Sequence, residues 1–323
     1  MNGDATRVTF GRSNIPGDVT VYADALLEGP VPAGLTDTEM QLVRERFHAL
    51  PADVDPGANW QRGMKAYPQY EEVVLWFEHD LFDQLLLIRH LDWFARRGLG
   101  STKLSLICIG RFPGIDMFLG LGQLTPDQLL SLLDTRAAVT VTQVELGRRA
   151  WRAFTAPDPR EIERVLESDT SALPFLGAAL RRWLEEFPAT GTGLPRSERA
   201  ILSLLAEGPQ SIRSLFHALF HREDSLMPTD SSFIGRIEEL ASGPRPLIEV
   251  QMESDDAPGL VTEVSVVKLP KGTVTTTDTG SDVLAGKADW LSLRPFDRWL
   301  GGVHVTNGSM WRWDVAGSRI RKE

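Results

Sequence analysis

The chain has 323 residues, 42% of them hydrophobic, so it can bury a full core and can form two or three domains. It contains no run of about 18 apolar residues and does not start like a signal peptide, so we expect a cytoplasmic protein without a membrane span. The formal net charge of −10 argues against a protein whose main role is to bind nucleic-acid backbones. Cys108 is the only cysteine, which excludes an internal disulfide and a cysteine-based zinc site.

The first two expected strands are short β-rich runs at residues 7–10 and 19–22. The loop after the first strand, residues 11–17, contains Ser13 and Asn14 and could offer backbone amides to a ligand. The loop lacks both the Gly-x-Gly-x-x-Gly spacing and the Walker lysine. It therefore predicts neither an NAD site nor a P-loop.

Two acidic residues, Asp24 and Glu28, follow the second expected strand in an otherwise apolar loop. Turn chemistry explains the Gly-Pro break that comes next, but it does not explain two acids. We take Asp24 as a candidate ligand-binding residue and Glu28 as a candidate catalytic one, with a solvated rim as the alternative. A helix over 37–50 and a loop over 51–63 are expected next.

The most informative stretch is a buried strand, residues 73–77, that runs directly into an amphipathic helix ending near Phe94. Five polar residues stand at the junction: Glu78, His79, Asp80, Asp83 and Gln84. They follow the carboxyl end of a strand and precede or open a helix. In open α/β sheets ligands bind at that edge.

The types of these side chains suit acid/base chemistry, with His79 as general base or acid and Asp80 or Asp83 orienting it. If His79 and Asp83 are both helical, they share a helix face, and the carboxylate raises the proton affinity of the imidazole. Glu78 and Gln84 are candidate ligand-binding residues. The structural alternative is that Asp80 or Glu78 only caps the helix.

A fourth strand is expected over 103–109, followed by a turn-rich loop with Arg111 and Asp116. Parallel strands joined by right-handed crossovers place their carboxyl ends on one edge. We therefore predict an α/β fold in which residues 1–124 form a Rossmann-like parallel sheet with helices on both faces. The four loops would line one crevice, with Arg111 among the ligand-binding residues.

The pattern of residues 125–190 is helical and predicts a segment packed on the sheet domain. Its expected helices cover 125–134, 141–154, 159–167 and 172–187. A Pro, Gly and Thr-rich linker at 187–193 marks the next boundary.

Residues 191–290 predict a winged-helix-like module. Its expected helices and strands are 197–207, 211–220, 230–241, 247–251 and 262–268. Residues 194–290 contain 9 Lys and Arg against 15 Asp and Glu, a balance of 9 − 15 = −6. The third helix, which reads DNA in helix-turn-helix proteins, has one arginine and two glutamates, so we expect no specific nucleic-acid binding.

Residues 291–323 predict a hairpin that turns at Asn307-Gly308. His304, which follows a pair of glycines in this segment, is a further candidate ligand-binding residue.

Four motifs together resemble a bacterial domain-of-unknown-function family, DUF1835. They are Asp24 to Val31, Leu75 to Gln84, Phe118 to Leu124 and Trp299 to Gly302, so the resemblance spans nearly the whole chain. The family implies an architecture but no established activity, and it provides no catalytic roles to transfer.

The preferred hypothesis is an enzyme that uses acid/base chemistry, by hydrolysis, elimination or isomerisation, on a small polar metabolite. No cofactor is predicted, although one histidine and several carboxylates could bind a divalent metal. The alternatives are a ligand-sensing transcription regulator and an adaptor whose winged helix binds protein. The sequence names neither a substrate nor an oligomeric state.

Overall fold

The computed structural model describes residues 1, 3–48, 56–223, 229–253 and 269–323. The chain divides into two compact units, one made of Met1–Leu180 with Trp299–Val303 and one made of Arg181–Arg298 with His304–Glu323. Among the described residues, no helix is long and apolar enough to span a membrane.

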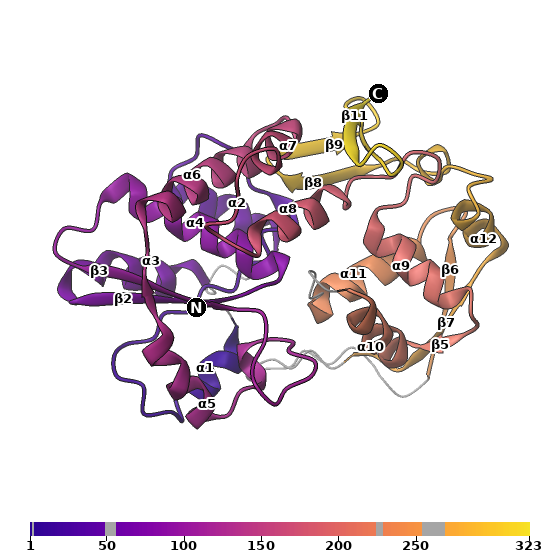
Figure 1. Ribbon diagram of the computed structural model, residues 1–323. Coiled ribbons are helices and arrows are strands. Elements are labelled where there is room, and N and C mark those ends of the chain that lie inside the picture. The colour runs from indigo at the N-terminus through magenta and orange to yellow at the C-terminus, as the bar shows by residue number, and fades with distance from the viewer. Residues whose placement is uncertain (2, 49–55, 224–228, 254–268) are drawn as a thin grey trace. The chain divides into compact units, whose positions relative to one another are not determined.

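The first unit is built around two parallel strands, β2 (Glu72–Glu78) and β3 (Lys103–Ile109), joined by helix α4 (Leu81–Arg97). Both strands and the helix were predicted and are confirmed. A short strand, β4 (Ala137–Ala138), pairs with β3 in the antiparallel direction. The sheet order is β2-β3-β4. With one parallel and one antiparallel pairing the sheet is mixed, and Figure 1 shows β2 and β3 side by side.

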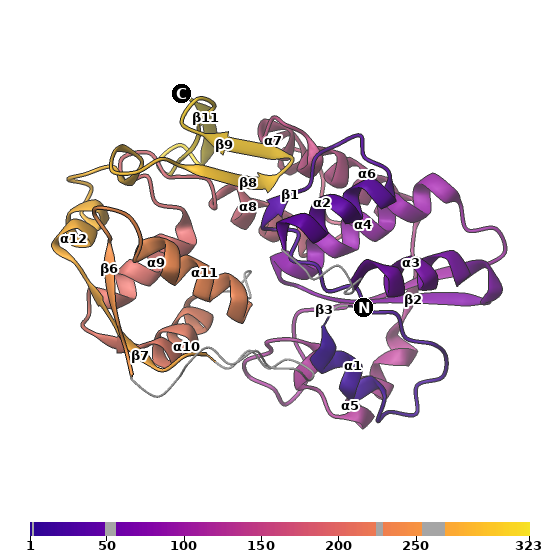
Figure 2. The same cartoon turned by 180° about the vertical axis from the view of Figure 1, so that it is seen from behind.

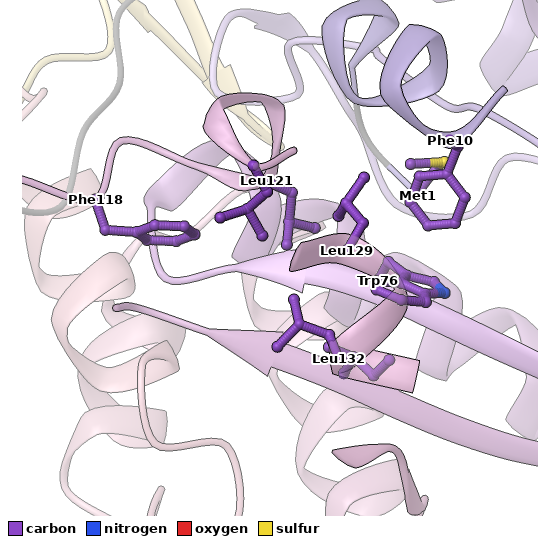
Figure 3. Packing of buried hydrophobic residues seen from close by; sticks show 9 residues of the cluster. Met1, Phe10, Trp76, Phe118, Leu121, Leu129 and Leu132 are labelled. Carbon is purple, nitrogen blue, oxygen red and sulfur yellow. The ribbon is translucent and has the colours of Figure 1, made fainter. Parts of the chain in front are cut away.

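Helices cover both faces of this sheet (Figures 1 and 2). On one face, α1 (Asp4–Phe10) and α5 (Pro126–Leu132) pack with the short helix η2 (Leu121–Gln123) over the strands. Figure 3 shows residues of this core, among them Phe10 and Trp76 of β2. Their rings pack edge-on, with the ring centroids 4.8 Å apart.

Helix α4 lies on the other face and is buried from Leu81 to Phe94. Strand residues Leu75 and Phe77 are buried on the same strand as Trp76 and, by the alternation of a strand, point to the opposite side. Helix α6 (Val141–Thr155) packs along α4, so α4 is buried nearly all round.

Three local predictions in this unit are wrong. Residues 7–10 belong to helix α1 and not to a strand, because the helix buries Phe10 against Trp76 and this packing overrides the β propensity of the run. Residues 19–22 form no strand, and the loop expected over 51–63 contains helix α3 (Pro56–Ala66). The observed fold is thus mixed α/β.

The other predicted helices of this unit are confirmed in outline. Helix α2 (Asp37–Phe47) begins with a capping box at Thr36. Helices α6, α7 (Arg160–Leu166) and α8 (Leu176–Leu184) lie within the segment expected to be helical, and α8 ends in the second unit.

In its described residues the second unit includes four complete α-helices and a small antiparallel sheet. The elements follow in the order α9 (Arg196–Leu205), β5 (Gln210–Ser211), α10 (Ile212–Arg222), α11 (Asp230–Leu240), β6 (Ile248–Met252), β7 (Gly272–Thr276) and α12 (Asp278–Leu284). The sheet order is β5-β7-β6. The strand expected at 262–268 lies outside the described residues.

The C-terminal strands differ from the predicted hairpin. They are β8 (Asp297–Gly301), β9 (Val303–Thr306), β10 (Trp311–Asp314) and β11 (Arg319–Lys322). A turn does occur at Asn307-Gly308, but it joins strands of different sheets. Strand β9 shares a sheet with β8 and β1 (Gly29–Pro30), whereas β10 pairs with β11.

Candidate functional site

The junction of β2 and α4 lies at the carboxyl edge of the two parallel strands. Glu78 is the last residue of β2 and is paired in register with Ile109, the last residue of β3. Asp80 is the N-cap of α4. The polar residues therefore lie at the edge where open α/β sheets bind ligands.

Three buried carboxyl groups, here called the acid cluster, are connected through backbone amides: Glu78, Asp80 and Asp83. The Asp83 amide donates to Asp80 Oδ1 at 2.9 Å, which is the capping bond that opens α4. The Glu78 amide donates to Asp83 Oδ2 at 2.6 Å. The capping role expected of Asp80 is thus confirmed.

Burial shifts the protonation of two members of this cluster. Burial and then the charge of Asp80 raise the pKa of Glu78 to about 8, against a hydrogen bond from the amide of Leu121. Burial raises the pKa of Asp80 to about 6, against hydrogen bonds from the amides of Asp83 and Phe82. The pair therefore keeps one proton near neutral pH, and its two titration steps belong to both groups together.

A close backbone approach completes the surroundings of Glu78. The amide of Leu121 donates to Glu78 Oε1 at 2.6 Å. Gly120 has φ 152°, and a Cβ at this position would lie 2.3 Å from Glu78 Oε2. Only glycine allows the loop to pass so close to the carboxyl group. Sequence reasoning placed Gly120 at the end of a turn-rich loop expected to line the crevice and used residues 118–124 for the family resemblance, but it missed the contact with Glu78.

Gln84 holds the carboxyl end of β2 through a hydrogen bond to its backbone. Its Nε2 donates to the backbone oxygen of Glu78 at 2.5 Å and lies 3.4 Å from Cys108 Sγ. Burial raises the pKa of the Cys108 thiol to about 12, as expected for an inert strand residue.

His79 is half-buried between β2 and the N-cap of α4. Its ring lies 6.3 Å from the ring of Phe118 and 6.1 Å from that of Phe175, measured between centroids. Because His79 precedes the helix, the premise that it shares a helix face with Asp83 is wrong. It adjoins the acid cluster through the chain, between Glu78 and Asp80.

Asp24 lies in a separate ion-pair group. Its carboxylate accepts hydrogen bonds from Arg44 at 2.6 Å and from the hydroxyl of Tyr22 at 3.1 Å, and lies 3.0 Å from His48 Nε2. Burial raises the pKa of Asp24, but the hydrogen bond from His48 and the charge of Arg44 together outweigh this effect. They hold the pKa well below its usual range. Such a group suits ion pairing better than proton donation. The backbone oxygen of Glu28 accepts from Arg44, and the Glu28 side chain is half-buried.

The other predicted ligand-binding residues are placed elsewhere. Ser13 Oγ donates to the Phe10 oxygen at the end of α1, and Asn14 and Arg111 are exposed. His304 belongs to the second unit, where its Nε2 lies 2.6 Å from Asp297 Oδ1. The structure therefore brings together Glu78, His79, Asp80, Asp83 and Gln84, but it does not form the predicted crevice of four strand ends, because two of those strands do not exist.

A shallow depression of about 420 Å³ lies at the opposite, amino edge of the sheet. It is lined by Pro68, Gln69, Tyr70, Glu71, Ser101 and Lys103. None of the predicted site residues lines it. We regard the acid cluster, with its shifted protonation, as the stronger candidate site.

Within the described ranges, no group of three or more His, Cys, Asp or Glu side chains is arranged to hold a metal ion. The divalent metal considered from the sequence stays an untested prediction.

Comparison of the chain with protein-family models, curated proteins and solved structures finds no match. The resemblance to DUF1835 therefore stays a prediction.

Proposed function

We propose that the chain is an enzyme that moves a proton on a small polar metabolite at the carboxyl edge of β2 and β3. The observation that carries this proposal is the raised pKa of Glu78, about 8, beside Asp80 at about 6. Neighbouring carboxyl groups with separated proton affinities are the arrangement that acid/base enzymes use. Hydrolysis, elimination and isomerisation are the reactions that suit it.

In this proposal Glu78 holds the proton and acts as general acid, while Asp80 spends more of its time ionised. His79, half-buried beside them, is the second proton carrier. The amide of Leu121 fixes the Glu78 carboxyl from one side. Asp83 and Gln84 position the strand end through backbone hydrogen bonds, so they are positioning residues and not catalytic ones.

The Rossmann-like assignment belongs to the same proposal. One β2-α4-β3 unit with parallel strands and its polar residues at the carboxyl edge supports it.

A metabolite screen by thermal unfolding tests the proposal, because a ligand that binds only the folded state raises the melting temperature with concentration. Hits are then assayed for turnover. We expect Glu78→Gln and His79→Ala to lower turnover by about 10²-fold or more, the usual contribution of a general acid or base. Glu72→Gln is the matched control, since Glu72 lies on the same strand at its amino end, bound to Arg136.

His79→Ala should leave the melting temperature of the unliganded protein close to that of the parent. If Glu78→Gln and His79→Ala turn over every hit as fast as the Glu72→Gln control does, the acid cluster is structural and the proposal is wrong.

A second function, a winged-helix adaptor that binds protein, has one specific observation in its favour. The order α9-β5-α10-α11-β6-β7 with sheet order β5-β7-β6 supports a winged-helix-like module. The one arginine of α11, Arg236, points inward to Glu186 and Glu198 at 2.9 Å each. A third helix without an outward cation favours a protein partner over DNA.

A further inference from the structure

Arg89 differs from the other buried arginines of the described residues. Four of them pair with a carboxylate: Arg44 with Asp24, Arg182 with Glu186, Arg236 with Glu198 and Arg312 with Asp289. Arg89 is 5% exposed, and its buried Nη1 has no hydrogen-bond partner in the described part of the chain. A buried guanidinium with an unsatisfied N–H donor is unfavourable, so this position calls for an explanation.

Three aromatic rings surround the guanidinium of Arg89. Its Cζ lies 4.6 Å from the ring centroid of Tyr22, 4.9 Å from that of Trp60 and 5.8 Å from that of Trp151. We call these four residues the Arg89 box. Cation–π attraction offsets part of the desolvation, but a ring face does not accept the in-plane N–H donors of Nη1, which stay unsatisfied among the described residues. Tyr22 and Trp60 are buried, whereas Trp151 is half-buried.

The charges around the box select the kind of anion. The neighbouring Asp24 is ionised and paired with Arg44 and His48, and Arg89 helps to lower its pKa. Arg44 already forms the ion pair with Asp24, so the positive charge of Arg89 is left to be balanced. One negative charge balances it, whereas a doubly charged phosphate would also meet the repulsion of Asp24.

We propose that the Arg89 box binds the carboxylate of a small organic acid. The planar guanidinium donates two parallel hydrogen bonds to the carboxylate oxygens, and the aromatic rings contact the apolar part of the molecule. Arg89 stands nine residues beyond Asp80 on α4, about 13 Å along the helix axis. The box is thus a site of its own, and it does not depend on the acid/base function proposed for Glu78.

Thermal unfolding of the full chain tests this site with acetate, benzoate and inorganic phosphate, each at constant ionic strength and pH, with chloride as reference. We expect both carboxylates to raise the melting temperature with concentration, with benzoate acting at lower concentration because its ring packs on the box, and phosphate to add nothing beyond chloride. Arg89→Lys keeps the charge but loses the bidentate geometry, so it should weaken the apparent affinity by about tenfold or more.

Arg97→Met is the matched control. Arg97 lies on the same helix with its Cζ 4.2 Å from the ring centroid of Trp93, but it is exposed and pairs with Asp37. This variant should keep the full carboxylate response. Arg89→Met should lose the response and melt no lower than the parent without ligand, because it removes a buried cation with an unsatisfied N–H donor.

Three results would overturn the proposal: no carboxylate response in the parent, an unchanged response in Arg89→Lys, or a response to phosphate alone. If Arg89→Met does not fold, Arg89→Lys and the parent still decide between a carboxylate site and a structural arginine.

Discussion

At the scale of single residues, the central feature is a glutamate that keeps its proton where exposed glutamates lose theirs. Glu78 is 7% exposed, accepts one backbone hydrogen bond and lies near the charge of Asp80. Burial disfavours the ionised form, and one amide hydrogen bond only partly compensates. The same burial that stabilises the neutral acid makes the folded protein sensitive to pH.

We predict that Glu78→Gln removes a loss of stability that the parent shows as the pH rises from 4.5 to 8. The pKa of Glu78 in the folded state, about 8, lies above its ordinary value of 4.5. The resulting stabilisation is complete below pH 4.5 and is lost as the pH rises toward 8, with a slope of up to about 1.4 kcal/mol per pH unit. Denaturant unfolding of parent and variant between pH 4.5 and 8 measures it.

The control for this titration is Glu72→Gln. A hydrogen bond from Ser105 lowers the pKa of Glu72, so its contribution to stability has the opposite sign and is lost as the pH falls. Equal pH dependence in the parent and Glu78→Gln would show that Glu78 ionises normally.

Two substitutions at Asp80 separate its helix-capping role from the effect of its buried charge. We predict that Asp80→Ala lowers the free energy of unfolding by about 1 kcal/mol, because the amide of Asp83 loses its acceptor. Asp80→Asn keeps a capping oxygen and removes a buried charge, so at pH 7 it should be at least as stable as the parent. Thermal unfolding of both variants at pH 7 checks this order, and an Asn variant as unstable as the Ala variant would contradict it.

At the scale of elements, the sequence predicts the helices and strands that have a clear hydrophobic periodicity. The apolar run at 73–77 and the three- and four-residue spacing in α4 specify the strand and helix that hold the acid cluster, and the structure confirms both. Residues 7–10 mislead, because their helical state depends on packing against Trp76, far along the chain. Gly120 and Leu121 were missed for the same reason: nothing local at 120 indicates Glu78.

Gly120→Ala tests whether the η2 loop holds the Glu78 carboxyl group. The added Cβ would meet Oε2 at 2.3 Å in a backbone conformation that favours glycine. We predict a drop of several degrees in melting temperature and lost turnover of any screened substrate. Gly114→Ala is the control, since Gly114 also has a positive φ but would place its Cβ with no atom within 4 Å. Similar losses in both variants would show that backbone strain alone explains the result and that the contact with Glu78 is not needed.

At the scale of the whole molecule, the net charge and the placement of the cations indicate which partners the protein can bind. The net charge is −10, and the exposed positions of α11 include Ser231, Gly235 and Glu238 but no cation. The cation of that helix, Arg236, is 8% exposed and pairs inward. Phosphate contacts supply most of the affinity of DNA-binding proteins, and this helix offers none.

We therefore predict no sequence-selective DNA binding. Gel-shift titration at low salt measures it, with a scrambled duplex as control. Nanomolar binding that prefers one sequence and weakens steeply with salt would instead favour the transcription regulator.

The most direct test of the proposed function is the titration of Glu78 itself. In a protein labelled with ¹³C at the glutamate carboxyl carbons, the Glu78 signal is the one that Glu78→Gln removes. We predict that this signal titrates with a midpoint near pH 8, with a smaller step near pH 6 from the coupled Asp80. A single midpoint near the ordinary value of 4.5 would contradict the account, because Glu78 would then hold no proton to donate at neutral pH.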